Sequence, residues 1–179
     1  MRVPAVMAAV LALAACDSGN VPPPGQEPLR PSTPQVEPNE VVLKGDGLVA
    51  GPEAFYFAAG RNEVEAAIAR AIGKASVTGE NAECGAGPIA YSTFSGGLTV
   101  HFQNGNLVGW NWRKEADFIR LSGDLRVGMP RAGIEAKSGF SMIEDSTLGE
   151  EFALGRAVGG FIEGDEVSML YAGTQCFFR

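Results

Sequence analysis

Histidine and cysteine are scarce in this sequence, with one histidine (His101) and three cysteines among 179 residues. A zinc site needs about four nitrogen, sulfur or carboxylate ligands, and a multi-histidine site is excluded here. No G-x-G-x-x-G turn follows the first predicted strand, so the sequence has no cradle for the pyrophosphate of a dinucleotide. No apolar run reaches the roughly 20 residues that a membrane-spanning helix needs. We therefore expect no metal and no cofactor.

Basic charge is also in short supply, because 14 Lys and Arg residues face 21 Asp and Glu residues, for a net charge of −7. A chain this acidic does not bind nucleic acid through its phosphates. Acidic residues concentrate between Glu144 and Glu166, where Arg156 is the only basic residue. This region predicts a solvated rim, with a surface for a basic partner or weak cation binding as the alternative.

The first fifteen residues have the pattern of a secretory signal: Arg2, an apolar run from Val3, and small residues before Cys16. The order Leu-Ala-Ala-Cys at positions 13–16 resembles the lipobox of bacterial lipoproteins, in which the cysteine is acylated and the signal is cut before it. The resemblance implies lipidation at Cys16. It also implies attachment to the inner or outer membrane of a bacterial envelope, facing the periplasm. An ordinary secretory signal is the alternative.

Residues 16–40 follow as a proline-rich tether. Seven of the 24 residues from Asp17 to Glu40 are proline, and few are aliphatic. Such a segment cannot bury enough apolar surface to offset its chain entropy. At about 3.1 Å per residue it could hold a domain up to roughly 70 Å from the membrane. The remaining residues, 41–179, are enough for one domain with a core.

Within 41–179, local patterns predict a short strand at Val41–Leu43 and another near Ile89–Phe94. The spacing of Val64, Ile68 and their apolar neighbours predicts an amphipathic helix that begins after an Asn62 N-cap and stops at Gly73.

Residues 98–113 carry the clearest hairpin signal. A three-residue turn at 104–106 pairs Leu98 with Trp112, Val100 with Trp110 and Phe102 with Val108, which gathers the apolar residues on one face. A two-residue turn at 104–105 is the alternative. The two tryptophans are predicted core residues, although aromatic side chains also suit ligand binding. The opposite face then presents a possible interaction surface made of His101, Gln103 and Asn111.

The second half of the domain looks like a diverged copy of the first. Residues 127–136 align with residues 57–66, and a second hairpin with a Gly164-Asp165 turn pairs Ile162 with Val167, Gly160 with Met169 and Val158 with Tyr171. The helix and hairpin lie about ten residues closer in this half. We predict an α+β fold of two strand-helix-hairpin repeats, 41–115 and 118–179, that form one antiparallel sheet with two helices on one face.

Cys84 and Cys176 remain as an even pair in an exported protein, which predicts a disulfide. A catalytic thiol is the alternative, and it would need His101 as its base. The carboxylate pairs Glu150-Glu151 and Glu163-Asp165 could serve a hydrolase if they lined a cleft. We expect them to be exposed and no catalytic residue to be present.

The repeat that begins with Gly128, Met129, Pro130 and Arg131 resembles the tandem modules of β-lactamase-inhibitor-type domains and outer-membrane-assembly lipoproteins. This resemblance implies protein binding through the open sheet face or hairpin loops. Residues 98–110 are also similar to small alphaproteobacterial lipoproteins that are often labelled aspartate-semialdehyde dehydrogenase. We expect a non-catalytic module that binds an envelope protein or component, is attached to the membrane by its lipid anchor and binds no nucleic acid. The dehydrogenase and a structural spacer are alternatives.

Overall fold

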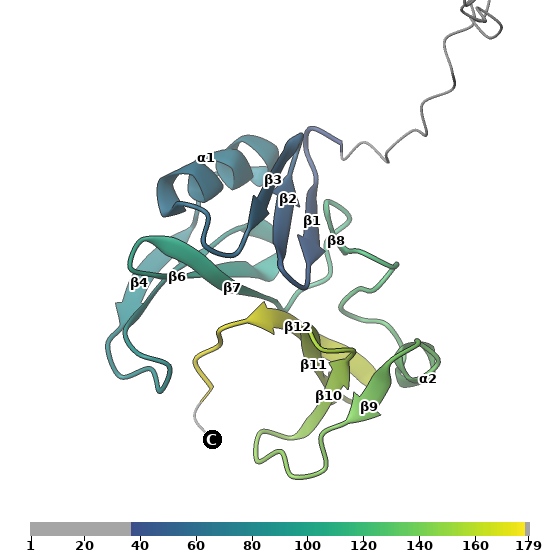
Figure 1. The fold of residues 1–179 in the computed structure, drawn as a ribbon. Coiled ribbons are helices and arrows are strands. Elements are labelled where there is room, and N and C mark those ends of the chain that lie inside the picture. The colour runs from purple at the N-terminus through teal and green to yellow at the C-terminus, as the bar shows by residue number, and fades with distance from the viewer. Residues whose placement is uncertain (1–36, 178–179) are drawn as a thin grey trace, which may run out of the picture. The chain divides into compact units, whose positions relative to one another are not determined.

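The structure is a computed structural model that describes residues 37–177 (Figure 1). The predicted signal and the predicted lipidation site at Cys16 lie outside the described residues, as does most of the predicted tether. The first half of the described chain contains β1 (Val41–Lys44), β2 (Gly47–Ala50), β3 (Glu53–Tyr56), α1 (Arg61–Ile72), β4 (Val77–Asn81), β5 (Ile89–Thr93), η1 (Ser95–Gly97), β6 (Leu98–Gln103) and β7 (Asn106–Trp112). The second half contains β8 (Ile119–Leu121), α2 (Arg131–Glu135), β9 (Phe140–Met142), β10 (Glu150–Leu154), β11 (Val158–Glu163) and β12 (Glu166–Gly173).

The strands form two sheets, so the prediction of one sheet is wrong. An eight-stranded antiparallel sheet has the order β4-β5-β6-β7-β12-β11-β10-β9, and a four-stranded mixed sheet has the order β3-β2-β1-β8. The physical reason lies in β1 and β2, in which seven of eight residues are buried. Strands that are apolar on both faces need cover on both sides. They therefore form a separate layer against the large sheet, beside α1.

The large sheet has its core on one face. Val64 and Ile68 of α1, Ile134 of α2 and Trp110 of β7 belong to one buried cluster, so both helices contribute to the core. The predicted core role of the two tryptophans is confirmed, since each is fully buried. The Trp110 indole donates to the carbonyl oxygens of Lys44 at 2.8 Å and Gly47 at 3.0 Å, which ties the small sheet to the large one.

The two halves share the same backbone contacts where each helix begins. The Arg61 and Arg131 N–H groups donate to the hairpin-turn carbonyls of Gly105 and Asp165, both at 2.8 Å. Isolated bridges likewise join Gly60 to Asn106 and Pro130 to Glu166. The helix starts differ by seventy positions and the hairpins by sixty, as in the sequence alignment. β7 and β12, the last strand of each half, pair at the centre of the large sheet.

The predicted three-residue turn of the first hairpin is wrong. Leu98 and Val100 face the two tryptophans as predicted, but Phe102 faces Leu107 and Gln103 faces Asn106. The turn has two residues, Asn104 and Gly105, both with positive φ (50° and 77°), as a type I′ turn requires. A bulge at Val108 restores the register, so Leu107 takes the core position that was predicted for Val108.

The second hairpin has the same turn and bulge. Gly164 and Asp165 form the predicted turn and Ile162 faces Val167, but a register shift follows. The pairs beyond the shift are therefore wrong: Gly160 faces Leu170 and Val158 faces Ala172.

Helix α1 matches its predicted apolar face and its stop at Gly73, but its N-cap is Gly60 and not Asn62. The sequence patterns did not predict β2, β3 or β8 of the small sheet, nor β4, β9 or β10 of the large sheet. In the three missed strands of the large sheet, the cause is the lack of a clear apolar pattern. Their residues are mostly exposed or half-buried, and the strands lack a regular apolar alternation.

Candidate functional site

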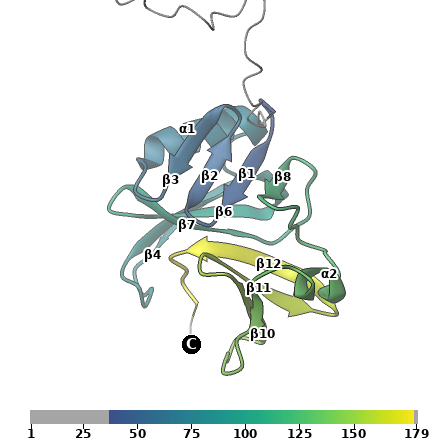
Figure 2. The same cartoon turned by 45° about the vertical axis from the view of Figure 1, so that its right-hand side comes forward.

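The second face of the large sheet carries the candidate site. In Figures 1 and 2, α1 and the small sheet lie on one side of β6 and β7, and the C-terminal segment lies on the other side. We call this second face the open face. Strand alternation places Arg113, Met169, Phe161 and Glu151 in one row across it, because Phe161 pairs with both Met169 and Glu151.

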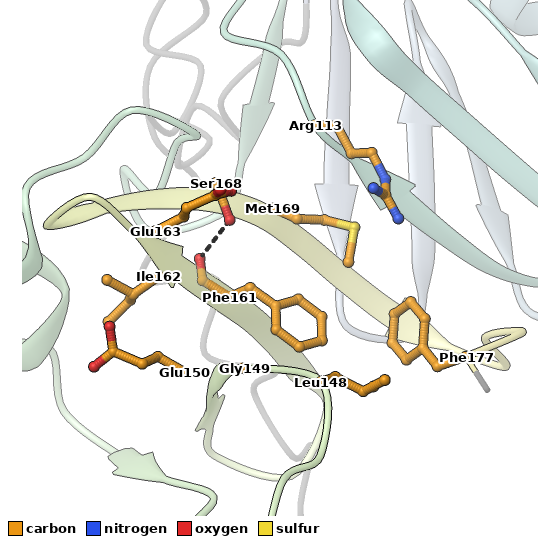
Figure 3. A pocket seen from close by; sticks show the side chains of 10 residues that line it. All are labelled: Arg113, Leu148, Gly149, Glu150, Phe161, Ile162, Glu163, Ser168, Met169 and Phe177. Carbon is orange, nitrogen blue, oxygen red and sulfur yellow. Dashed lines mark hydrogen bonds between the residues drawn. The ribbon is translucent and has the colours of Figure 1, made fainter. Parts of the chain in front are cut away.

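A cavity of about 720 Å³ lies on the C-terminal half of the open face (Figure 3). Its floor contains Phe161 and Met169, with Phe177 and Leu148 as apolar walls. Arg113 also lines the cavity, as do Glu150 and Glu163. An apolar floor with a few charged groups is the usual make-up of a binding site for a ligand or an anchoring side chain.

Three aromatic rings form a cluster at one wall of this cavity. The ring centroids of Phe161 and Tyr171 are 5.8 Å apart. Phe177 meets both rings edge to face, with centroid distances of 5.5 Å to Phe161 and 5.1 Å to Tyr171. The Tyr171 ring lies over Gly159, where a Cβ atom would come within 2.2 Å of the ring. Glycine at this position therefore allows the ring to lie flat on the sheet.

A buried carboxylate fixes the tyrosine. The Tyr171 hydroxyl donates to Glu151 Oε1 at 2.5 Å, and Ser146 Oγ donates to Glu151 Oε2 at 2.6 Å. Glu151 is fully buried. Both of its oxygens accept hydrogen bonds, which is what a buried carboxylate needs in order to remain stable. These two hydrogen bonds fix the position of the Tyr171 ring and thereby orient the aromatic cluster.

His101 and Asn111 lie on the open face as predicted, but they are buried, each with 7% of its surface exposed. His101 Nδ1 donates to the carbonyl of Thr174 at 3.0 Å, and Asn111 Nδ2 donates to His101 Nε2 at 3.1 Å. Burial lowers the pKa of His101, Arg113 lowers it further, and the Thr174 bond opposes them. With both ring nitrogens engaged, the histidine is a structural group beneath the C-terminal segment and is not placed to activate a nucleophile.

Gln103, the third residue of the predicted interaction surface, reaches the loop that joins β4 to β5. Its Nε2 donates to the carbonyl of Ala86 at 2.9 Å and to those of Gly87 and Pro88 at longer range. The loop and the C-terminal segment thus hold all three residues of the predicted surface, and the exposed cavity lies farther along the sheet.

Cys84 and Cys176 are neighbours, but their sulfur atoms are not at bonding distance. The structure therefore has two neighbouring thiols here and no disulfide. Burial and the Cys84 contact raise the pKa of the Cys176 thiol to about 11. Because the thiolate is the reactive form, this environment disfavours a nucleophilic Cys176 at neutral pH.

The candidate carboxylate pairs do not converge on one point. Glu150 and Glu151 are adjacent on a strand, but Glu151 is fully buried, whereas Glu150 is exposed and lines the cavity. Glu150 and Asp165 both pair with Arg131, at 2.6 Å and 3.2 Å, at the exposed start of α2. Part of the acidic region is thus neutralised by one arginine, while Glu163 remains at the cavity.

Sequence reasoning missed Phe161 and Phe177 as site residues. One signal could have found the first: Phe161 and Tyr171 occupy the strand positions opposite to the core residues of β11 and β12. Apolar residues on both faces of a strand indicate that both faces have a use. Nothing local to Phe177 indicates its contact with Phe161.

No family model, curated protein or solved structure matches the chain. Across residues 37–177, no helix is long and apolar enough to cross a membrane. The same residues contain no group of three or more His, Cys, Asp or Glu side chains that could hold a metal ion.

Proposed function

We propose that the protein is a lipid-anchored, periplasm-facing envelope lipoprotein whose domain binds another envelope protein without catalysis. The two strand-helix-hairpin repeats would supply the binding sheet, and Cys16 the anchor. One observation carries this proposal: a cavity of about 720 Å³, with an apolar floor, lies on the sheet face opposite the core. A hollow that combines an apolar floor with a few charged side chains is typical of a binding site.

The chemistry of the cavity indicates its partner. Phe161 and Met169 would receive an apolar side chain, since buried aromatic anchors dominate the energy of protein interfaces. Glu163 at the cavity and the neighbouring acidic turn favour a partner with a basic residue beside that anchor. Arg113 would select against a second basic group on the other side.

Site-specific photo-crosslinking in intact envelopes tests the proposal. A crosslinker at Leu148, on the cavity wall, is expected to capture a discrete partner. The same crosslinker at Glu63, exposed on α1, is the matched control and is expected to capture none. A Cys16→Ser chain should leave the membrane fraction and lose the product.

Equal capture from both positions, or none from Leu148, would contradict a binding role for the cavity. Turnover of an aldehyde with a nicotinamide cofactor by the purified domain would instead favour the dehydrogenase alternative.

A further inference from the structure

The C-terminal segment Thr174–Phe177 crosses the open face after β12 ends at Gly173. The Thr174 N–H donates to the Val108 carbonyl at 2.8 Å, and the Thr174 carbonyl accepts from His101. Gln175 Nε2 donates to the carbonyls of Trp110 and Ala172 at 3.0 Å and 2.9 Å. The segment is thus an extended strap across the central strands.

Phe177 ends the strap inside the proposed binding cavity. Its ring forms one wall of the cavity, beside Phe161 (Figure 3). The Phe177 ring meets the rings of both Phe161 and Tyr171 edge to face. This is the geometry in which aromatic rings attract each other beyond simple area burial. The chain therefore displays which ligand the two rings accept, namely an aromatic side chain.

The strap carries one buried polar atom that has no hydrogen bond in this position. Among the described residues, the buried oxygen Oε1 of Gln175 has no hydrogen-bond partner. A buried acceptor without a donor opposes burial of the segment that carries it. Residues 174–177 are each half-buried, whereas the core strands beneath them are buried. These features are typical of a segment that can leave without disturbing the core.

Cys176 lies next to Phe177 in the strap and beside Cys84 in the β4–β5 loop. Asn81 Nδ2 donates to Cys176 Sγ at 3.1 Å, and Cys84 and Gly85 lie beside the Cys176 thiol. One covalent bond between the neighbouring sulfurs would fix the strap one residue before the aromatic ring.

We propose that Phe161 and Tyr171 form a receptor for an aromatic side chain of the partner, that Phe177 occupies it in cis, and that a Cys84–Cys176 disulfide locks this state. The proposal rests on the proposed function, since it names the regulation of that site. In the locking step both thiols lose a proton and one electron each, and the sulfur–sulfur bond forms. A small-molecule or protein disulfide accepts the two electrons and protons and becomes two thiols. Reduction reverses the step and frees the strap.

The probe is a peptide that follows the strap with serine in place of Cys176, acetyl-Thr-Gln-Ser-Phe-amide, so that it cannot form a disulfide. The same peptide with Ala in place of Phe is its control. A flexible tether gives Phe177 an effective concentration on the order of millimolar, so the probe is titrated into that range. Binding is followed by the NMR shift of the Met169 methyl group on the cavity floor. The Met129 methyl group, in the core on the other face, is the internal control.

Phe177→Ala should bind the probe about tenfold more tightly than the reduced wild type, because it lacks the tethered competitor. The probe affinity of Phe177→Leu should lie between those of the wild type and Phe177→Ala. This graded result would show that the gain in affinity is not caused by unfolding. Glutathione disulfide should join Cys84 to Cys176, with loss of both free thiols, and abolish probe binding by the wild type. Cys176→Ser under the same treatment should bind as the reduced wild type does.

Equal probe binding by the wild type and Phe177→Ala would refute the claim that Phe177 competes with the probe for the two rings. Failure of glutathione disulfide to form the bond, or undiminished probe binding after it forms, would overturn the lock. These readouts use the isolated protein, so a failed crosslink from Leu148 in envelopes would contradict the proposed partner role while leaving the strap result intact.

Discussion

Acidification should weaken the fold through His101. The neutral ring donates from Nδ1 to Thr174 and accepts at Nε2 from Asn111. A proton on Nε2 would set a donor against the donor of Asn111 and would leave a charge 7% exposed beside Arg113. The lost hydrogen bond alone is worth about 1 kcal/mol.

The sign follows from the direction of the pKa shift. Burial lowers the folded-state pKa of His101 below its ordinary 6.5, so the unfolded chain binds the proton first as the pH falls. Stability is therefore fully present above pH 6.5 and is lost as the pH falls toward the folded pKa. One proton gives a slope of at most about 1.4 kcal/mol per pH unit.

Urea unfolding between pH 7.5 and 5.0 measures this slope. His101→Gln is the matched variant, because its amide can donate and accept but does not titrate in this range. We expect the free energy of unfolding of the wild type to fall with pH relative to that of the variant. Parallel curves would refute the buried-imidazole reasoning, and a wild type that gains stability on acidification would reverse its sign.

Three further perturbations have defined outcomes. Trp110→Phe removes the indole donor from two carbonyls, and each buried acceptor left unpaired costs about 1–3 kcal/mol, which urea unfolding would show as a lower midpoint at unchanged slope. Gly159→Ala places a Cβ within 2.2 Å of the Tyr171 ring, so the ring must move away from the sheet. The near-ultraviolet circular dichroism spectrum should change and the free energy of unfolding should fall by about 1–3 kcal/mol, whereas an unchanged spectrum would contradict the packing. The Cys176 pKa of about 11, against an ordinary 9.0, makes the thiolate fraction at pH 8 about a hundredfold smaller than that of an ordinary thiol. Because a thiolate of higher pKa is also more nucleophilic, alkylation of Cys176 should be roughly tenfold slower, and equal rates would refute the raised pKa.

The hairpins show how far sequence patterns determine this fold. The apolar pairs of Val100 with Trp110 and Leu98 with Trp112 follow from alternation, since a slip of one residue would expose both tryptophans. The same argument gave the wrong turn at 104–106. It did not allow for a bulge at Val108, which lets a tight two-residue turn and the apolar alternation coexist.

The small sheet and the edge strands were beyond local reasoning. Val41–Leu43 reads as a strand, but its parallel partner Ile119–Leu121 lies almost eighty residues away. Nothing in either segment specifies this pairing. β4 is an edge strand with exposed residues and a central Gly79, and such a strand depends on its neighbour more than on its own propensity.

The candidate site was predictable only in part. The even pair of cysteines predicted a Cys84–Cys176 disulfide, and the structure has two neighbouring thiols there without a bond. His101, Gln103 and Asn111 were placed on the correct face, but that half of the face lies under the β4–β5 loop and the strap. Local alternation gives the direction of a side chain and does not reveal what later covers it.

The β4–β5 loop and the strap cover only one half of the open face, although the hairpins of both halves of the sheet have the same turn and bulge. In the first half, the loop from 82 to 88 binds Gln103, and Cys84 in the loop meets the strap through Cys176. In the second half, the equivalent face carries Phe161 and Met169 and opens into the cavity. The strap begins over the first half and ends with Phe177 in the second. One half of the open face is thus covered and the other half carries the cavity. Residues 174–177 run from the covered half to the cavity, so access to the cavity can be controlled at this segment.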